Sequence, residues 1–146
     1  MSDGETPTVL FLCPHNALRS VIAAALFNRD ADGRARGESA GTEPDERVNE
    51  RTVTVLREVG IEVPDERPGK VTRQQIEQAT RVVSLDCPLP PELTAVAASK
   101  LENWPMPDTA GKPVEAVREV RDLIQVRVDR LLGEMGAGSG GDDERR

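Results

Sequence analysis

The feature that most constrains this chain is an apolar segment near its start, followed by a short polar loop and a second apolar segment. The first segment, residues 8–12, reads TVLFL, and a run this apolar is typical of a parallel strand buried on both faces of a sheet. The second segment, residues 21–27, reads VIAAALF, and its composition favours a helix. The chain therefore begins as a strand, a loop and a helix, and CPHNALRS is the loop that joins them.

This loop carries a thiol where the strand ends and a guanidinium where the helix begins, Cys13 and Arg19. A helix N-terminus offers unpaired N–H groups and a positive dipole end, so it attracts anions and favours the thiolate form of a nearby cysteine. A guanidinium adds a planar set of donors that matches a tetrahedral oxyanion. We predict an oxyanion cradle with Cys13 as its nucleophile; the alternative is an inert buried thiol beside a solvated arginine.

The other loop residues are assigned from the groups that they can offer. Pro14 has no N–H, so the cradle amides are expected from the residues that follow it. Ser20 can donate its hydroxyl to the thiolate, or it is a plain first-turn serine. Asn16 can brace the loop through its side chain, or simply tolerate a left-handed backbone. The predicted oxyanion-binding residues are His15, Asn16, Ala17, Leu18, Arg19 and Ser20.

Apolar periodicity and Gly/Pro punctuation predict alternating strands and helices along the rest of the chain. Thr72 is expected to cap a short helix, and GAGSGGDDERR at residues 136–146 reads as a flexible tail after a single domain over 1–135. The alternation implies an α/β fold, a four-stranded parallel sheet covered by helices on both faces. We expect further strands at 35–40, 81–85 and 100–104, and helices at 46–58, 73–78, within 91–98, and 114–132.

Three chemically interesting residues follow predicted strands, and the carboxyl ends of parallel strands are where such sheets bind ligands. Cys13 follows the first strand, Cys87 the third and Asp108 the fourth, so we expect them to converge. Asp108 is a candidate general acid that would protonate a leaving oxygen, or else a solvated turn aspartate. Cys87 is a candidate second redox thiol, or else a cysteine buried for packing.

The motifs themselves resemble a known family. CPHNALRS resembles the Cys-x5-Arg-Ser loop of the low-molecular-weight protein tyrosine phosphatase superfamily, and SAGTEP and VVSLDC resemble later segments of it. The His-Asn-Ala within the loop and the segment NWPMPDTAGKP are most similar to the superfamily's arsenate reductase branch. The resemblance spans about residues 8–132 and implies a three-layer sandwich with strand order 2-1-3-4. Thr109 departs from it, because the acid loop usually carries proline there.

The resemblance implies an arsenate reductase that converts arsenate to arsenite. Cys13 would form a thiol–arsenate adduct, Arg19 would bind the oxyanion, Asp108 would act as the acid and Cys87 as the resolving thiol. The thioredoxin-coupled members look as if they need a third cysteine, where this chain has Thr94. Hence the expected partner is an external reductant, either thioredoxin or a small thiol with a glutaredoxin-like protein, and no tightly bound cofactor is expected.

Two other functions stay open at this point. The first is a phosphatase that hydrolyses phosphomonoesters through a cysteinyl-phosphate, without Cys87. Phosphotyrosine is disfavoured as its substrate, because two Phe, one Trp and no Tyr leave few rings to line an aromatic pocket. The second is a non-catalytic oxyanion-binding or redox-sensing protein.

Composition limits the partners and the compartment. A net charge of −7 argues against nucleic acid and anionic membranes as partners. There is no apolar run long enough to span a bilayer, and the acidic start MSDGETPT lacks the features of a signal peptide. One His and two Cys are too few for a zinc site, so no metal is expected. We expect a cytoplasmic monomer, whose two cysteines serve chemistry rather than a structural disulfide.

Overall fold

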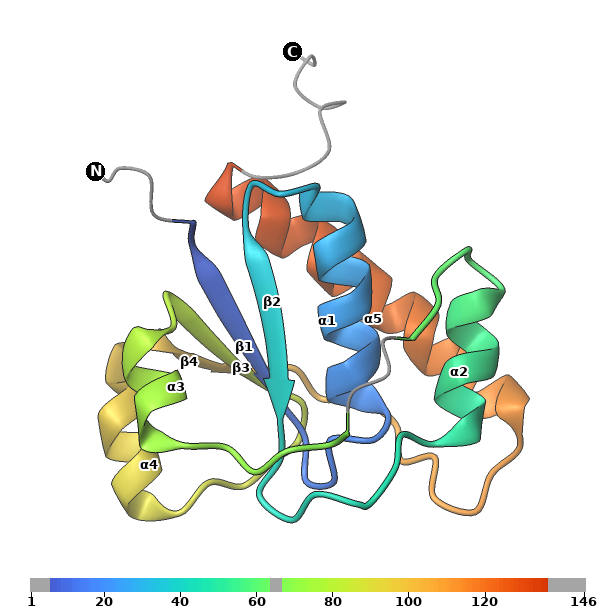
Figure 1. The fold of residues 1–146 in the computed structure, drawn as a ribbon, viewed down its shortest axis with the longest axis horizontal. Helices are drawn as coiled ribbons and strands as arrows, with labels where there is room; N and C mark the ends of the chain where they lie inside the picture. The colour runs from blue at the N-terminus through green and yellow to red at the C-terminus, as the bar shows by residue number, and fades with distance from the viewer. Residues whose placement is uncertain (1–5, 64–66, 137–146) are drawn as a thin grey trace.

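The computed structural model describes residues 6–63 and 67–136, and it alternates strands and helices as expected (Figure 1). The domain boundary at residue 135 and the tail stay predictions, since residues 137–146 lie outside the described part. The elements in chain order are β1 (Thr8–Leu12), α1 (Arg19–Ala31), β2 (Arg36–Ala40), α2 (Glu50–Arg57), α3 (Arg73–Gln78), β3 (Arg81–Ser84), α4 (Pro91–Ala97), a 3-10 turn (Ala98–Lys100), β4 (Leu101–Asn103) and α5 (Val114–Met135).

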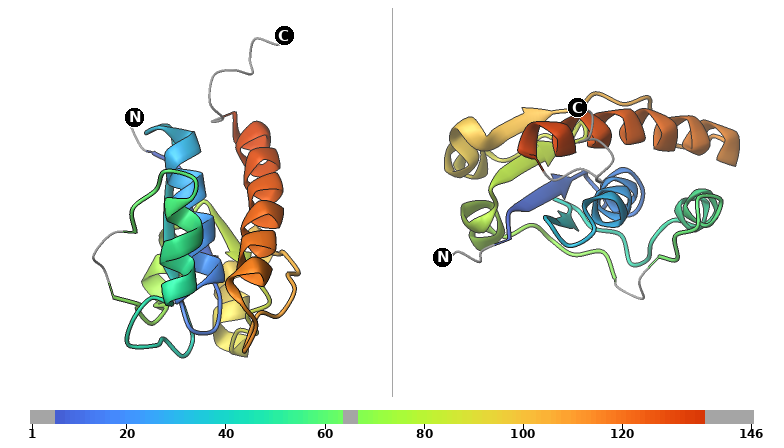
Figure 2. Two further views of the ribbon diagram at one scale, coloured as in Figure 1. Left: turned by 90° about the vertical axis from the view of Figure 1, so that its right-hand side faces the viewer. Right: turned by 90° about the horizontal axis from the view of Figure 1, so that it is seen from above.

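The four strands form one parallel sheet in the order β2-β1-β3-β4, which confirms the predicted α/β architecture and strand order. Helices α1, α2 and α5 cover one face, and α3 and α4 cover the other (Figure 2). Because all four strands run parallel, their carboxyl ends lie along the same edge of the sheet. The loops after β1, β2, β3 and β4 therefore leave the sheet at the same edge (Figure 1).

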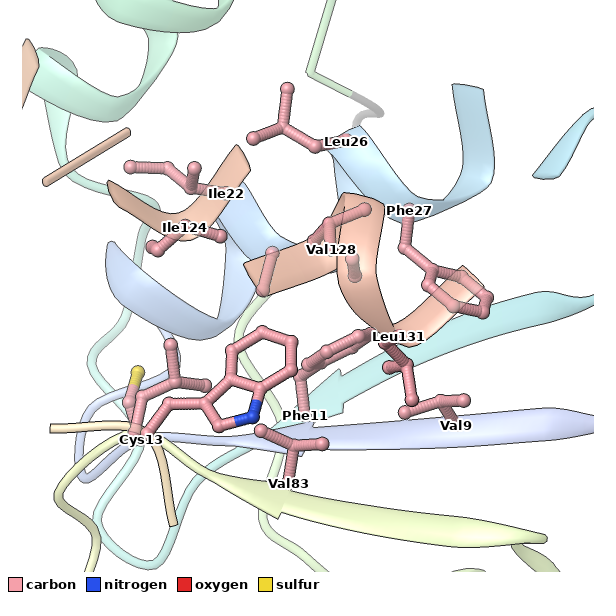
Figure 3. Close-up of a cluster of buried hydrophobic side chains, with 14 of the residues drawn as sticks. Val9, Phe11, Cys13, Ile22, Leu26, Phe27, Val83, Ile124, Val128 and Leu131 are labelled. Atoms are coloured by element: carbon pink, nitrogen blue, oxygen red, sulfur yellow. The ribbon is translucent and has the colours of Figure 1, made fainter. Parts of the chain in front are cut away.

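Alternation along β1 divides its side chains between two cores. Val9, Phe11 and Cys13 belong to the larger cluster, which packs under α1 and α5 (Figure 3). Leu10 and Leu12 belong to the smaller cluster under α3 and α4. Each fully buried side chain of this size contributes about 1.5–3 kcal/mol relative to an exposed one. The central strand is thus anchored from both faces, and it holds Cys13 at a fixed position where it ends.

The aromatic side chains all lie in the larger core. The ring of Phe11 is 5.6 Å from that of Phe27 and 5.7 Å from that of Trp104, between ring centroids. Phe11 and Phe27 are fully buried, and Trp104 is 1% exposed. These are the two Phe and the one Trp of the chain, which has no Tyr. The face that α1 and α5 cover therefore contains every aromatic ring of this protein.

The prediction for α2 was wrong at its start, because the helix begins at Glu50 and not at residue 46. Asn49 caps it by accepting the Arg51 N–H at 2.9 Å, which satisfies an N–H that the helix itself leaves unpaired. The residues before Asn49 run alongside the first loop instead and bond to it. There the N–H of Glu43 donates to Pro14 O at 2.8 Å. The structure thus uses this segment to support the loop rather than to lengthen the helix.

Other element ends differ by smaller amounts. Thr72 caps α3 through a reciprocal pair of bonds with Gln75, as predicted for that position. Helix α5 continues to Met135, three residues beyond its predicted end, and stops at Gly136 with a φ of +69°. Glycine adopts this left-handed backbone without steric cost, which explains why the helix ends there. Among the described residues, no helix is both long and apolar enough to cross a membrane.

An ion cluster joins α2 to α5. Glu58 pairs with Arg118 at 2.7 Å and with Arg121 at 2.8 Å, and Arg121 also donates to the Val55 carbonyl at 2.9 Å. The hydrogen bond from Arg118 is the largest cause that lowers the pKa of Glu58 to about 2. Stabilisation from this carboxylate is therefore present above its unfolded pKa of about 4.5 and is lost as the pH falls toward 2.

Candidate active site

The loop between β1 and α1 holds the candidate nucleophile at the carboxyl edge of the sheet. The Cys13 N–H donates to the Ala40 carbonyl at 3.3 Å, which extends the β1–β2 ladder by one residue. Its side chain is 3% exposed and faces the core under α1 (Figure 3). Helix α1 begins at Arg19, so its first turn lies directly above the thiol. The strand, loop and helix predicted from the sequence are confirmed.

Two donors from Ser20 converge on the Cys13 sulfur. Its hydroxyl oxygen lies 3.0 Å from Sγ, and its N–H donates to Sγ at 3.3 Å. Asn16 donates from Nδ2 to the same hydroxyl oxygen at 2.8 Å. Since the oxygen already accepts a bond from Asn16, its own proton is free to point at the sulfur. This chain of bonds stabilises negative charge on Cys13, as a nucleophilic thiolate requires.

Asn16 combines the two roles considered for it. Its backbone is left-handed, with a φ of +50°, which asparagine tolerates better than most residues. Its side chain is buried, and Oδ1 accepts the Gly69 N–H at 2.9 Å while Nδ2 serves Ser20. Asn16 therefore both shapes the turn and braces it against a distant segment.

The backbone of the loop presents unused donors. In the described part of the chain, no hydrogen bond takes up the N–H groups of residues 15–19. The carbonyls of the same loop are bonded outward, since Pro14, His15 and Ala17 accept from Glu43, Asp45 and Asn49. The amides are thereby left for an anion inside the loop, together with the dipole of α1. Ser20, also in the predicted set, differs because its N–H donates to the Cys13 sulfur, and anion binding by the other residues stays a prediction.

The side chain of His15 is directed to the neighbouring segment. Its Nδ1 lies 3.0 Å from the Glu43 carbonyl oxygen and 3.7 Å from Asp45 Oδ1. Because a carbonyl only accepts, Nδ1 carries the proton and donates. The ring is largely exposed, and within the described ranges no three His, Cys, Asp or Glu residues gather as a metal site would need.

Gly41 allows the segment after β2 to lie against the loop. A Cβ at this position would come within 2.6 Å of Pro14 O and 2.7 Å of Cys13 O, which is closer than atoms can pack. The Gly41 N–H donates to Gly69 O at 2.9 Å, and this ties the same strand end to a third segment. The sequence did not single out Gly41 for this role, and its contact with the loop was missed.

Arg19 is held by a residue that the sequence analysis did not single out. Its Nη1 lies 3.8 Å from Oδ2 of Asp86, the residue two positions after β3. Asp86 has a left-handed backbone, with a φ of +58°. Its carboxylate also accepts from the Met106 N–H at 2.8 Å and from Asn103 Nδ2 at 3.3 Å. Asp86 therefore connects the candidate oxyanion ligand to the loop after β4.

Cys87 lies next to Asp86 and is 4% exposed. Both cysteines are free. Burial raises the pKa of the Cys87 thiol, and the charge of Cys13 raises it further, while Thr42 and the charge of Arg19 lower it. Thr42 Oγ1 is 3.9 Å from the sulfur. Cys87 follows Asp86, the partner of Arg19, but it packs in the smaller core whereas Cys13 packs in the larger one, so the convergence of the two thiols stays a prediction.

The other side of Cys87 borders a hollow of about 430 Å³ at the surface. Thr94, the residue that stands where a third cysteine was considered, lines the same hollow from α4. A reagent that enters it would approach Cys87 from outside the oxyanion loop. The remaining lining residues are Ser84, Asp86, Pro88, Leu89, Leu101 and Asn103.

Asp108 is exposed on the loop between β4 and α5. Its Oδ1 accepts the Ala110 N–H at 3.0 Å and so closes a turn. Among the described residues, no hydrogen bond engages its second carboxylate oxygen. Within the described ranges no hydrogen bond or ion pair joins Asp108 to Cys13 or Arg19. Its link to the cradle is indirect, through Met106 and Asp86, so its role as the acid stays a prediction.

Comparisons with known proteins agree with these features. The family model described as low molecular weight phosphotyrosine protein phosphatase matches residues 8–139. A provisionally named arsenate reductase from Halobacterium salinarum is 32% identical over 139 residues, which cover 92% of this chain and 96% of that protein. A glutaredoxin arsenate reductase from Synechocystis is 28% identical over 130 residues, which cover 87% of this chain and 97% of that protein.

A solved structure extends the comparison to three dimensions. An arsenate reductase from Archaeoglobus fulgidus is 33% identical, with a TM-score of 0.71, and the match covers 86% of this chain and 98% of that one. The fold and the length of the match both agree. This chain belongs to the low molecular weight phosphotyrosine protein phosphatase family.

Proposed function

We propose that this protein is an arsenate reductase. The observation that carries the proposal is the second buried thiol, Cys87, which directly follows Asp86, the residue whose carboxylate lies 3.8 Å from the Arg19 guanidinium. An enzyme that only hydrolyses phosphate esters needs one thiolate. A reductase needs two thiols that can supply two electrons to the same substrate atom.

In the first step the Cys13 thiolate attacks the arsenic of arsenate, and an oxygen leaves as water. Ser20 stabilises the thiolate beforehand, and Arg19 with the amides of residues 15–19 binds the remaining oxygens. Asp108 supplies the proton to the departing oxygen. The product is a covalent thiol–arsenate adduct in which arsenic is still pentavalent.

In the second step Cys87 attacks the sulfur of Cys13. A sulfur–sulfur bond forms, the sulfur–arsenic bond breaks, and its electron pair stays on arsenic, which leaves as trivalent arsenite. Two thiols are thereby oxidised to one disulfide while arsenic gains two electrons. The Ser84 hydroxyl bonds both the N–H and the carbonyl of Cys87, at 2.9 and 3.0 Å. We expect these bonds to break as the segment moves to bring the two Cα atoms within about 7 Å.

An external thiol reductant completes the cycle. The chain has two cysteines, so a relay through a third one is impossible and the reductant must act on the Cys13–Cys87 disulfide itself. Two routes remain: thioredoxin, or a small thiol with a glutaredoxin-like partner. One relative is named a glutaredoxin arsenate reductase, which supports the use of an external thiol reductant without identifying it. We place this cycle in the cytoplasm, where thiols are kept reduced, with the chain acting as a monomer.

The second candidate function is hydrolysis of phosphomonoesters through a cysteinyl-phosphate. The family match favours it, and it uses the same cradle without Cys87. The buried position of Phe11, Phe27 and Trp104 argues against phosphotyrosine as the substrate. With every Phe and Trp ring buried and no Tyr in the chain, the loop lacks the large rings that would line an aromatic pocket for that substrate. A non-catalytic oxyanion-binding or redox-sensing role remains the third candidate.

One experiment separates these functions. The reduced protein is incubated with arsenate, its free thiols are alkylated, and the products are identified by mass spectrometry. A Cys13–Cys87 disulfide, or an arsenate-dependent small-thiol adduct on either cysteine, is the expected result. If both thiols stay free while an aryl phosphate is hydrolysed, the protein is a phosphatase. If neither reaction occurs, and alkylation of Cys13 changes only anion binding, the protein is not an enzyme.

A further inference from the structure

The first turn of α2 contacts the oxyanion loop. The Asn49 N–H and the Thr52 hydroxyl both donate to the Ala17 carbonyl, at 3.0 and 2.8 Å. Thr52 is fully buried, so the second of these bonds is shielded from water. This helix start is therefore fixed relative to the loop that carries the candidate nucleophile.

The same turn carries Arg51, whose side chain points to the loop of Asp108. Its Nη1 donates to the Thr109 carbonyl at 2.9 Å and also to the Lys112 carbonyl. Its Nε donates to Asn49 Oδ1 at 3.2 Å. Three oxygens thus hold one guanidinium, and bonds from a charged donor are stronger than those between neutral groups.

The loop of Asp108 is consequently tied on both sides of the acid. On one side the Met106 N–H donates to Asp86, the partner of Arg19. On the other side Arg51 holds the Thr109 carbonyl, which also accepts the Lys112 N–H at 3.0 Å. Only Pro107 and Asp108 lie between the two ties.

We propose that Arg51 is the positioning residue that fixes Asp108 relative to the oxyanion loop. The inference rests on the proposed function, because it takes Asp108 as the acid of the first step. Threonine at position 109 does not restrict φ as a proline would. Arg51 restrains this part of the loop from outside by holding the Thr109 carbonyl. Without it, the carboxyl group samples more positions and is less often placed to protonate the leaving oxygen.

The test is a double-mutant cycle with Arg51→Met and Asp108→Asn. Each variant is reduced and mixed with arsenate, and thiol loss is followed in a single turnover over a range of arsenate concentrations. Asp108→Asn is expected to lower the saturating rate constant by about 100-fold, which is typical of losing a general acid. Arg51→Met is expected to lower it by about tenfold, with half-saturating arsenate unchanged, since the oxyanion ligands remain in place.

Two further variants control for folding. Arg57→Met removes a largely exposed arginine from the last turn of the same helix, whose partner Glu62 is at 3.2 Å, and it should react like the parent protein. Arg51→Lys keeps the charge and can reach one carbonyl, so it should recover part of the rate. If Arg51 had a purely structural role, Arg51→Met would instead weaken arsenate binding. It would also slow the parent protein and the Asp108→Asn variant to the same extent.

The cycle gives a clear decision. If Arg51→Met slows the parent but not Asp108→Asn, the two residues act through one another and the inference holds. If the two effects multiply, or if Arg51→Met leaves the saturating rate unchanged, Arg51 does not act through Asp108 and the inference is wrong. If Asp108→Asn reacts normally, both the acid assignment and this inference fail, while disulfide formation between Cys13 and Cys87 would still support the reductase.

Discussion

The two thiols of this site have opposite surroundings. Cys13 has two donors from Ser20 directed at its sulfur, supported by Asn16. Cys87 has a threonine hydroxyl at 3.9 Å, and burial raises the pKa of its thiol. The first thiol is prepared to react in the structure as it stands. The raised pKa of the second favours its protonated form, and Ser84 bonds its backbone, so under the proposed function adduct formation is expected before disulfide formation.

Replacing Cys13 should have the largest effect. Cys13→Ser is expected to abolish both arsenate reduction and any phosphatase activity, because a serine hydroxyl in this cradle is a much weaker nucleophile than a thiolate. Both activities are measured by steady-state assays, and the melting temperature serves as the control for folding. Retained turnover in a folded variant would show that Cys13 is not the nucleophile.

Replacing Cys87 should affect arsenate reduction but not phosphate ester hydrolysis. Cys87→Ser is expected to abolish release of arsenite while any hydrolysis of an aryl phosphate continues, since only the second step needs this thiol. Arsenite is quantified in solution and phosphate release is measured in parallel. Loss of both activities, together with a lower melting temperature, would mean that Cys87 is present for packing.

Removing the donor to the first thiol should have a moderate effect. Ser20→Ala deletes a hydrogen bond to a charged group, worth about 1.5–3 kcal/mol, so the single-turnover rate should fall by about 10- to 100-fold near neutral pH. The alkylation rate of Cys13 against pH measures the same loss independently. An unchanged alkylation profile would show that Ser20 does not stabilise the thiolate.

The pH dependence should distinguish the two steps. Because burial raises the pKa of Cys87 above the ordinary thiol value, its thiolate becomes more abundant as the pH rises. Disulfide formation should therefore accelerate by up to about tenfold per pH unit through the neutral range. Quenched-flow trapping of the adduct and the disulfide at several pH values separates the steps. A disulfide rate that is flat with pH would contradict a protonated resting Cys87.

The smallest effect is expected at Thr42. Thr42→Val keeps the shape of the side chain but removes the hydroxyl near Cys87. Loss of a weak bond of this length corresponds to about a threefold change in the rate of disulfide formation. The change should appear in disulfide formation and not in adduct formation, measured by the same trapping experiment. Thr54→Val, on the exposed face of α2, is the matched control.

The sequence was sufficient for the parts of this site that are local. The apolar TVLFL and the following polar loop predicted β1 and the start of α1, because these signals lie in one short stretch of sequence, although the strands that pair with β1 are distant in the chain. The parallel strand order followed from the resemblance and is confirmed.

Contacts between distant segments could not be predicted in the same way. Gly41 lies 28 residues after Cys13, and its role depends on backbone atoms that approach only in the folded chain. Asp86 and Arg51 read in the sequence as ordinary surface charges, because no local pattern marks their partners on other loops. The early start predicted for α2 has the same cause: local periodicity does not show that residues 43–49 support another loop.

The packing of Trp104 gives this protein an optical property of its own. With one tryptophan and no tyrosine, near-ultraviolet emission comes from a single buried indole. The backbone N–H of Trp104 donates to the Ser84 carbonyl at 2.7 Å, while its indole N–H donates to Glu102 at 2.9 Å, and the Ser84 hydroxyl accepts the Cys87 N–H. Fluorescence should therefore report on any movement of Cys87 in real time, without any label and without overlapping signals from elsewhere in the molecule.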